Sequence, residues 1–175
     1  MPNILAQALF HACAAGDAAA VSRLLPAGGT PRNLSGPRFQ TPDGPNTTPL
    51  MVAALNGRTE IVRMLLALAP NTAVDHADAR GFTALLMVTL YHHADILRLL
   101  VDHGANLNFA GPRGDTPLRL SVQQIHPDGR PRDPDPDGAR RIATVRALLR
   151  LGAGTLPPHT PAQPFSYFWR IFLFP

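Results

Sequence analysis

Three segments that begin with threonine recur along this chain at nearly constant spacing. They begin at Thr48 (TPLMVAAL), Thr83 (TALLMVTL) and Thr116 (TPLRLSVQ), which are 35 and 33 residues apart. Each precedes a second apolar segment, and these read EIVRMLL at 60–66, DILRLLV at 95–101 and ATVRALL at 143–149. A period of this length is typical of repeat proteins, in which a single unit cannot bury its apolar face alone. The repeat therefore constrains the fold more than any single motif does.

Residues 48–66 show why each unit is expected to contain two helices. Thr48 can cap the first helix with its hydroxyl group, and the proline that follows costs no hydrogen bond at the first helical position. Asn56 and Gly57 then predict a left-handed turn that reverses the chain. The second helix has one apolar face, made by Ile61, Val62, Leu65 and Leu66.

The repeated unit resembles the ankyrin repeat. The segment DARGFTAL at 78–85 matches the opening of that repeat, and DHGANLN at 102–108 matches its close. A degenerate copy, LFHACAAGDAAAVSRLL at 9–25, precedes the three threonine-led copies. The resemblance covers most of residues 4–156. It implies an all-α solenoid of stacked helix-turn-helix units joined by β-hairpin-like loops.

The chain also departs from the family pattern. Met51, Leu86 and Arg119 replace the histidine that usually follows the threonine motif, so we expect its hydrogen bonds to threonine to be absent. The glycine between the two helices becomes His92 in the third copy and Ile125 in the fourth. We therefore expect weaker turns in these two copies.

The repeats divide the chain as follows. We predict an ankyrin repeat domain at 1–156, with repeats at about 4–33, 43–75, 78–110 and 111–156, followed by a proline-rich linker and aromatic tail at 157–175. Insertions at 30–42 and 126–139 are rich in proline, glycine and charge, so we expect mobile surface loops there.

The resemblance implies a protein partner that binds the concave face formed by hairpin tips and first helices. Carried over by register, the predicted partner-binding residues lie at the tips and at the first-helix ends. They are Thr47, Leu55, Asn56, Arg80, Phe82, Leu90, Tyr91, Arg113, Asp115, Gln123 and Gln124. Arg80, Phe82 and Tyr91 are the strongest candidates, because arginine and aromatic side chains dominate interface energetics. Phe82 could instead cover the neighbouring hairpin, and Tyr91 could cap the core.

Composition limits the other possibilities. Hydrophobic residues make up 45% and charged residues 16% of the 175 residues, as in globular proteins. The net charge of +4 is modest and the arginines are dispersed, so we expect no nucleic acid partner. We see no secretory signal and no apolar run of 18 residues, and the single cysteine excludes an internal disulfide. We expect a soluble, cytoplasmic monomer.

Residues that could carry chemistry have simpler explanations. His92, His93 and Asp95 form an HHxD cluster, but no further metal ligand is apparent, so we read it as a surface turn. The segment DPDPDG at 133–138 resembles half of a calcium loop, yet Thr144 stands where the bidentate glutamate belongs. Cys13 fits a buried, inert thiol. With no nucleophile constellation, we expect neither an enzyme nor a cofactor.

The C-terminal segment FSYFWRIFLFP at 165–175 holds six aromatic residues. It could fold back on the last repeat as a cap, anchor the chain to a membrane surface or a partner, or have no selected role. We favour the cap, because it would cover apolar surface at the end of the array. Our main hypothesis is a non-catalytic protein-interaction scaffold. The alternatives are a membrane-associated adaptor that uses this tail, with Arg170 beside it, or a regulatory subunit of an enzyme.

Overall fold

The computed structural model describes residues 4–25, 47–68, 74–111, 113–122 and 138–154, and these contain helices and turns but no β-strand. The first two helix pairs are α1 (Ile4–Ala15) with α2 (Ala18–Leu24) and α3 (Pro49–Leu55) with α4 (Thr59–Leu68). The next two are α5 (Ala84–Leu90) with α6 (Ala94–Asp102) and α7 (Pro117–Val122) with α8 (Ala139–Arg150).

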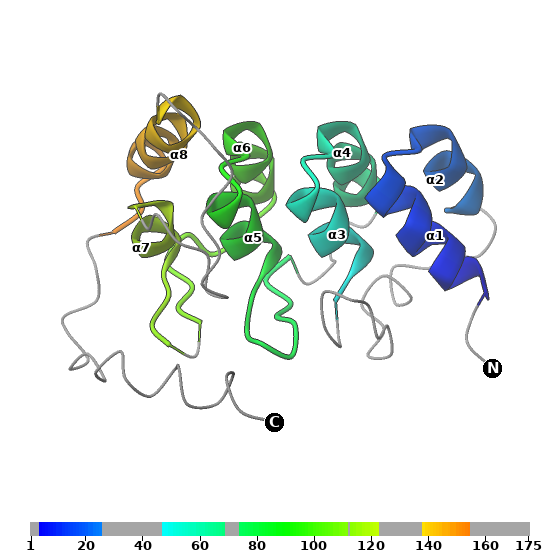
Figure 1. The fold of residues 1–175 in the computed structure, drawn as a ribbon, viewed down its shortest axis with the longest axis horizontal. Coiled ribbons are helices and arrows are strands. Elements are labelled where there is room, and N and C mark those ends of the chain that lie inside the picture. The colour runs from blue at the N-terminus through cyan, green and yellow to red at the C-terminus, as the bar shows by residue number, and fades with distance from the viewer. Residues whose placement is uncertain (1–3, 26–46, 69–73, 112, 123–137, 155–175) are drawn as a thin grey trace.

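The helices form two layers in a one-dimensional stack (Figure 1). One layer contains α1, α3, α5 and α7, and each of these helices contacts its neighbour in the layer. The other contains α2, α4, α6 and α8, which also contact one another in order. The loops before α5 and α7 project on the side away from the second layer (Figure 1). This arrangement confirms the predicted all-α solenoid.

The three threonines cap the first helices as the sequence predicts. The hydroxyl oxygens of Thr48, Thr83 and Thr116 each accept a hydrogen bond from the amide three residues later, at 3.2, 3.3 and 3.3 Å. The extended backbone at Thr48 and Thr83 is the usual conformation of such a cap. The helices α3, α5 and α7 therefore each begin at a fixed residue, which sets the register of their units.

Two of the residues that replace the family histidine bond to the repeat in other ways. The sulfur of Met51 accepts a hydrogen bond from the Thr48 amide at 3.4 Å, which completes a capping box. Arg119 reaches back instead, and its Nη1 donates to the carbonyls of Arg113 and Gly114, both at 3.5 Å. Leu86 is fully buried in the core. The missing histidine is thus replaced differently in each repeat.

The turns between paired helices use left-handed residues. Gly16 and Gly57 have φ of 87° and 67°, and His92 has φ of 60° at the same place in the third unit. His92, which we predicted to weaken this turn, therefore adopts the same left-handed backbone as the glycines. Its side chain makes that conformation less favourable than it is for glycine. Ile125, named for the fourth unit, lies outside the described residues.

The core runs along the stack between the layers. The predicted apolar face of α4 is buried throughout, with Ile61, Val62, Leu65 and Leu66 at most 2% exposed. The next unit repeats this pattern with Ile96, Leu97 and Leu100 of α6. Packing against the adjacent unit removes these side chains from water, and this burial is the main stabilising contribution in such a stack.

Several predictions concern segments outside the described residues. The insertion at 30–42, most of the insertion at 126–139 and the tail at 165–175 belong to this group. Among the described residues, no helix is long and apolar enough to cross a membrane.

Candidate partner-binding surface

The hairpin before α5 is organised around one buried carboxylate. Asp78 accepts hydrogen bonds from the amides of Arg80 and Phe82 at 2.9 and 2.8 Å. The backbone closes the turn, because the Asp78 amide donates to the Phe82 carbonyl and the Gly81 amide donates to the Asp78 carbonyl, both at 2.9 Å. A single aspartate therefore satisfies the loop amides and fixes its shape.

The same carboxylate holds the arginine at the tip. Arg80 Nη2 lies 2.8 Å from Asp78 Oδ2, and Arg80 Nε donates to the same oxygen at 2.9 Å. The guanidinium also lies over the Phe82 ring, 5.8 Å from its centroid. The Arg80 side chain is still 54% exposed, whereas the Asp78 side chain is fully buried. Arg80 is thus held in place at its base and open to solvent at its end.

The hairpin before α7 repeats this construction with different residues. Arg113 occupies the position equivalent to Arg80, and its Nε donates to Asp115 Oδ2 at 3.2 Å. The Gly111 amide bonds to the Asp115 carbonyl at 3.2 Å. The Arg113 side chain is 40% exposed and that of Asp115 only 9%. Two consecutive tips therefore carry an arginine supported by a nearly buried carboxylate.

The end of α5 forms a second part of the surface. Tyr91 is 37% exposed and stacks on His93, with ring centroids 6.5 Å apart and an angle of 10° between the planes. His93 Nε2 lies 3.2 Å from the carbonyl oxygen of Leu55 in the preceding unit. Because that oxygen can only accept, Nε2 must be the donor. The aromatic pair therefore also joins two units.

The imidazole of His93 is partly removed from water. This burial lowers the pKa of His93, the hydrogen bond to the Leu55 carbonyl opposes the shift, and the charge of Arg140 adds to it. A second link of this kind lies one unit earlier, where Arg58 Nε donates to the Ala14 carbonyl at 3.4 Å. In the second and third units, the residue after the turn thus reaches back to the first helix of the preceding unit.

The predicted partner-binding residues differ widely in exposure. Arg80, Arg113, Tyr91 and Asn56 are exposed, and Leu55 is half-buried. The buried ones are Thr47, Phe82, Leu90 and Asp115. Gln123 and Gln124 lie outside the described residues. Sequence register placed these residues near the tips and helix ends, but it did not tell which would be covered by a neighbouring unit.

Two residues that build this surface were not among the predicted ones. Asp78 orders the tip and His93 supports Tyr91. Asp78 had a visible signal, because it opens the repeat motif DARGFTAL. The contact of His93 with Leu55 joins residues 38 positions apart, and no local sequence pattern predicts it.

The thiol and the possible metal ligands singled out in the sequence lie in surroundings that fit a structural role. Cys13 is fully buried, and burial raises the pKa of its thiol to about 12. In the part of the chain that the structure describes, no three His, Cys, Asp or Glu residues are grouped as metal ligands. Thr144, at the last position of the calcium-like segment, is buried in α8 and donates to the Arg140 carbonyl at 2.9 Å.

Comparison with known sequences agrees with this architecture. A family model described as "Ankyrin repeats (3 copies)" matches residues 5–75, and the model "Ankyrin repeat" matches residues 80–111. Together the matches cover more than half of the chain, which belongs to the ankyrin repeat family. Repeats of this family generally serve as protein–protein interaction modules.

Similar curated proteins are much longer than this chain. The rat "Ankyrin repeat and SAM domain-containing protein 6" is 29% identical over 130 residues, which is 71% of this chain and 13% of that protein. The mouse "Ankyrin repeat and MYND domain-containing protein 1" is 40% identical over 53 residues, or 30% of this chain and 6% of that protein. The Drosophila melanogaster "Transient receptor potential cation channel subfamily A member 1" is 26% identical over 122 residues, which is 68% of this chain and 9% of that protein.

Proposed function

We propose that this chain is a non-catalytic scaffold that binds a protein partner on the concave face, through its hairpin tips and first-helix ends. The main support is the pair of tip arginines. Arg80 and Arg113 occupy equivalent positions in consecutive units, and each is oriented by a carboxylate while remaining at least 40% exposed. Arginine held in this way loses less conformational freedom on binding.

Tyr91 extends the proposed contact to the end of α5. Its ring is stacked on His93, which is itself bonded to the neighbouring unit, so the exposed part of the ring is already oriented. Rigid aromatic side chains provide contact area at small entropic cost. Together with Asn56 and the half-buried Leu55, Tyr91 would belong to an interface of about 800 Å² on each partner.

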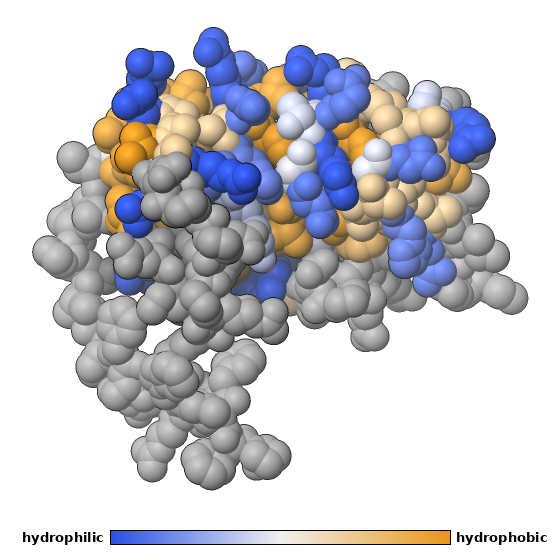
Figure 2. All heavy atoms as spheres, turned by 45° about the horizontal axis from the view of Figure 1, so that its top comes forward, coloured by the Kyte–Doolittle hydropathy of each residue, from blue (hydrophilic) through white to orange (hydrophobic). Residues whose placement is uncertain are grey.

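The outer helices provide a contrasting surface. Their exposed charges pair within one helix, as in Arg63 with Glu60 at 3.7 Å and Arg98 with Asp102 at 3.8 Å. Figure 2 shows hydrophilic side chains standing along this face of the stack. Because such exposed pairs contribute little energy, we read this face as solvated and assign the partner to the opposite layer.

The proposal also includes the domain boundaries, the cellular compartment and the oligomeric state expected from the sequence. The repeat domain would span 1–156, and the chain would act in the cytoplasm as a monomer. The membrane adaptor and enzyme-subunit alternatives draw no support from a described residue.

The test compares two surfaces of the same folded chain. Affinity capture from native lysate is done with the wild type, with Asn56→Ala/Tyr91→Ala, and with Arg63→Ala/Arg98→Ala as a matched control on the outer helices. We expect the first variant to lose most of a captured protein that the control retains, while both unfold near the wild-type temperature. Equal capture by both variants, or loss only in the control, would remove the proposed surface.

Arg80 is deliberately left out of that capture variant. Replacing it would uncover the buried Asp78 carboxylate, so a loss of binding could reflect a disturbed hairpin. Asn56 and Tyr91 are exposed, and their truncation leaves the Asp78 network intact.

A further inference from the structure

The last described unit exposes three large apolar side chains. Val122 of α7 and Leu149 of α8 are both 57% exposed, and Ile142 of α8 is 51% exposed. With Val145 and three arginines they line an open groove of about 780 Å³ between the two helices. In Figure 2, hydrophobic surface is visible at the α8 end of the stack. Apolar side chains grouped in this way mark a surface that another group covers.

Repeat register explains why this surface is open. The positions equivalent to Val122 are Ala54 and Thr89, which are fully buried because another first helix packs on them. The positions equivalent to Leu149 are Leu66 in α4, which is 1% exposed, and Val101 in α6, which is half-buried. Val122 and Leu149 therefore occupy positions that an adjacent unit covers elsewhere in the stack. The groove therefore lies on the face of the last described unit where no further described unit packs.

The chain leaves the last unit beside this groove. α8 ends at Arg150, and the Gly154 amide is fixed by a hydrogen bond to Asn108 Oδ1 at 2.9 Å. Residues 155–175 follow, and no threonine among them has a leucine two residues later, so they do not begin another unit of the threonine-led kind. They do contain the apolar segment 165–175, with six aromatic residues and no acidic residue.

The linker is long enough for this segment to reach the groove. Residues 155–164 can span about 33 Å when extended, at roughly 3.3 Å per residue. Helix α8 has 12 residues and is therefore about 18 Å long. A tethered segment also has an effective concentration on the order of millimolar, so even weak apolar contact suffices to populate the docked state.

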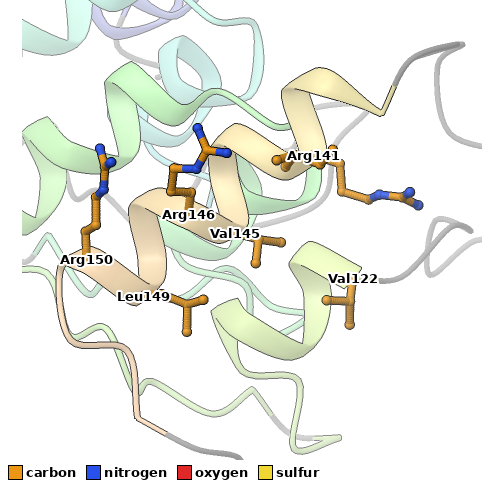
Figure 3. A pocket seen from close by; sticks show the side chains of 7 residues that line it. Val122, Arg141, Val145, Arg146, Leu149 and Arg150 are labelled. Atoms are coloured by element: carbon orange, nitrogen blue, oxygen red, sulfur yellow. The ribbon is translucent and has the colours of Figure 1, made fainter.

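The rim of the groove suits aromatic side chains. Figure 3 shows Val145 and Leu149 on one side of α8, and Arg146 and Arg150 on the other. α8 carries four arginines and no acidic residue. Aromatic rings can pack on the valine and leucine side chains and accept guanidinium groups on their faces. Leu173 and Ile171 would add aliphatic surface to the same contact.

We propose that residues 165–175 dock in the α7–α8 groove of the same chain and cover this face of the last described unit. The apolar segment then covers Val122, Ile142 and Leu149 on the face where the inner units pack against a neighbour. This contact is intramolecular, and it is separate from the hairpin-tip surface proposed for the partner.

Trp169 is the only tryptophan in the chain and lies inside the proposed segment, so its fluorescence reports on docking without a label. In the wild-type chain, we expect emission at shorter wavelength than in urea and low accessibility to acrylamide. Leu149→Glu and Val122→Glu should each move the emission to longer wavelength and raise the quenching constant severalfold. Both positions are exposed, so helix content and the unfolding transition should stay close to wild type.

Ala19→Glu is the matched control, because it adds the same charge at an exposed position of α2, at the other end of the stack. It should leave the Trp169 emission unchanged. Wild-type emission already at the position found in urea would overturn the proposal, and so would emission that neither groove variant alters. Concentration-dependent emission with a sedimenting dimer would assign the groove to a second copy instead. A blue shift seen only with phosphatidylglycerol vesicles would assign the segment to a membrane and equally refute docking.

Discussion

The contact between consecutive turns can be tested by comparing two glycines with similar backbones. Gly57 and Gly104 have φ of 67° and 89°, so a Cβ atom is unfavourable at either position. A Cβ on Gly104 would meet no atom within 4 Å, whereas a Cβ on Gly57 would lie 2.8 Å from Cε1 of His93. Alanine at the two positions thus separates backbone strain from the loss of an inter-unit contact.

The expected magnitudes follow from these surroundings. The left-handed backbone costs alanine about 1 kcal/mol at both positions, after part is offset by the lower entropy of the unfolded chain. At Gly57 the His93 ring must also move. It then loses the hydrogen bond to Leu55, worth about 1 kcal/mol, and part of its stacking on Tyr91, worth roughly 0.5 kcal/mol. We therefore expect a loss of about 1 kcal/mol for Gly104→Ala and about 2.5 kcal/mol for Gly57→Ala.

Urea and thermal unfolding followed by circular dichroism provide the assay. At about 3 °C per kcal/mol for a chain of this size, the two variants should differ by roughly 4 to 5 °C in Tm. In a His93→Ala background the extra cost at Gly57 should disappear, because the ring is no longer there to be displaced. Equal losses for both glycines, or an unchanged Gly57 penalty without His93, would refute the inter-unit role of this histidine.

Three further predictions concern buried polar groups and the thiol. Asp78→Asn should reduce the free energy of unfolding by about 1 to 3 kcal/mol, because it weakens a buried pair, while Asp102→Asn at an exposed pair should change it little in the same urea titration. Because the pKa of His93 is lowered in the fold, the unfolded chain binds the extra proton below about pH 6.5; stability should fall from pH 7 to 5, and less steeply in His93→Gln. The Cys13 thiol, with a pKa raised to about 12, should react with iodoacetamide at pH 8 far more slowly in buffer than in urea, and fast labelling of the native protein would contradict its burial.

Sequence reasoning succeeded where the determinants are local. Thr48 marks a helix start because its hydroxyl reaches an amide three residues away, and the structure confirms this bond. Gly57 marks a turn because of its own backbone freedom, and its positive φ confirms that prediction. The spacing of Ile61 and Leu65 likewise predicts a buried face, which the structure also confirms.

The sequence was less informative where a contact joins separate units or depends on an unusual residue. The sulfur of Met51 takes the place of a histidine, although thioether sulfur is a weak acceptor and gives no clear signal. His92 adopts a left-handed backbone that a glycine pattern would not predict. Phe82 fits a surface anchor by residue type, but it is 9% exposed and belongs to the hydrophobic core that runs through the units. Exposure is set by packing between units, which periodicity alone does not give.

The proposed binding face is tested most directly by hydrogen–deuterium exchange of the chain with and without its captured partner. The account predicts slower exchange on binding at the amides of the hairpin tips, around 80–82 and 113–115, and at the ends of α3 and α5. Exchange in the outer helices α4, α6 and α8 should stay unchanged. Protection confined to those outer helices, with the tips unaffected, would contradict the account.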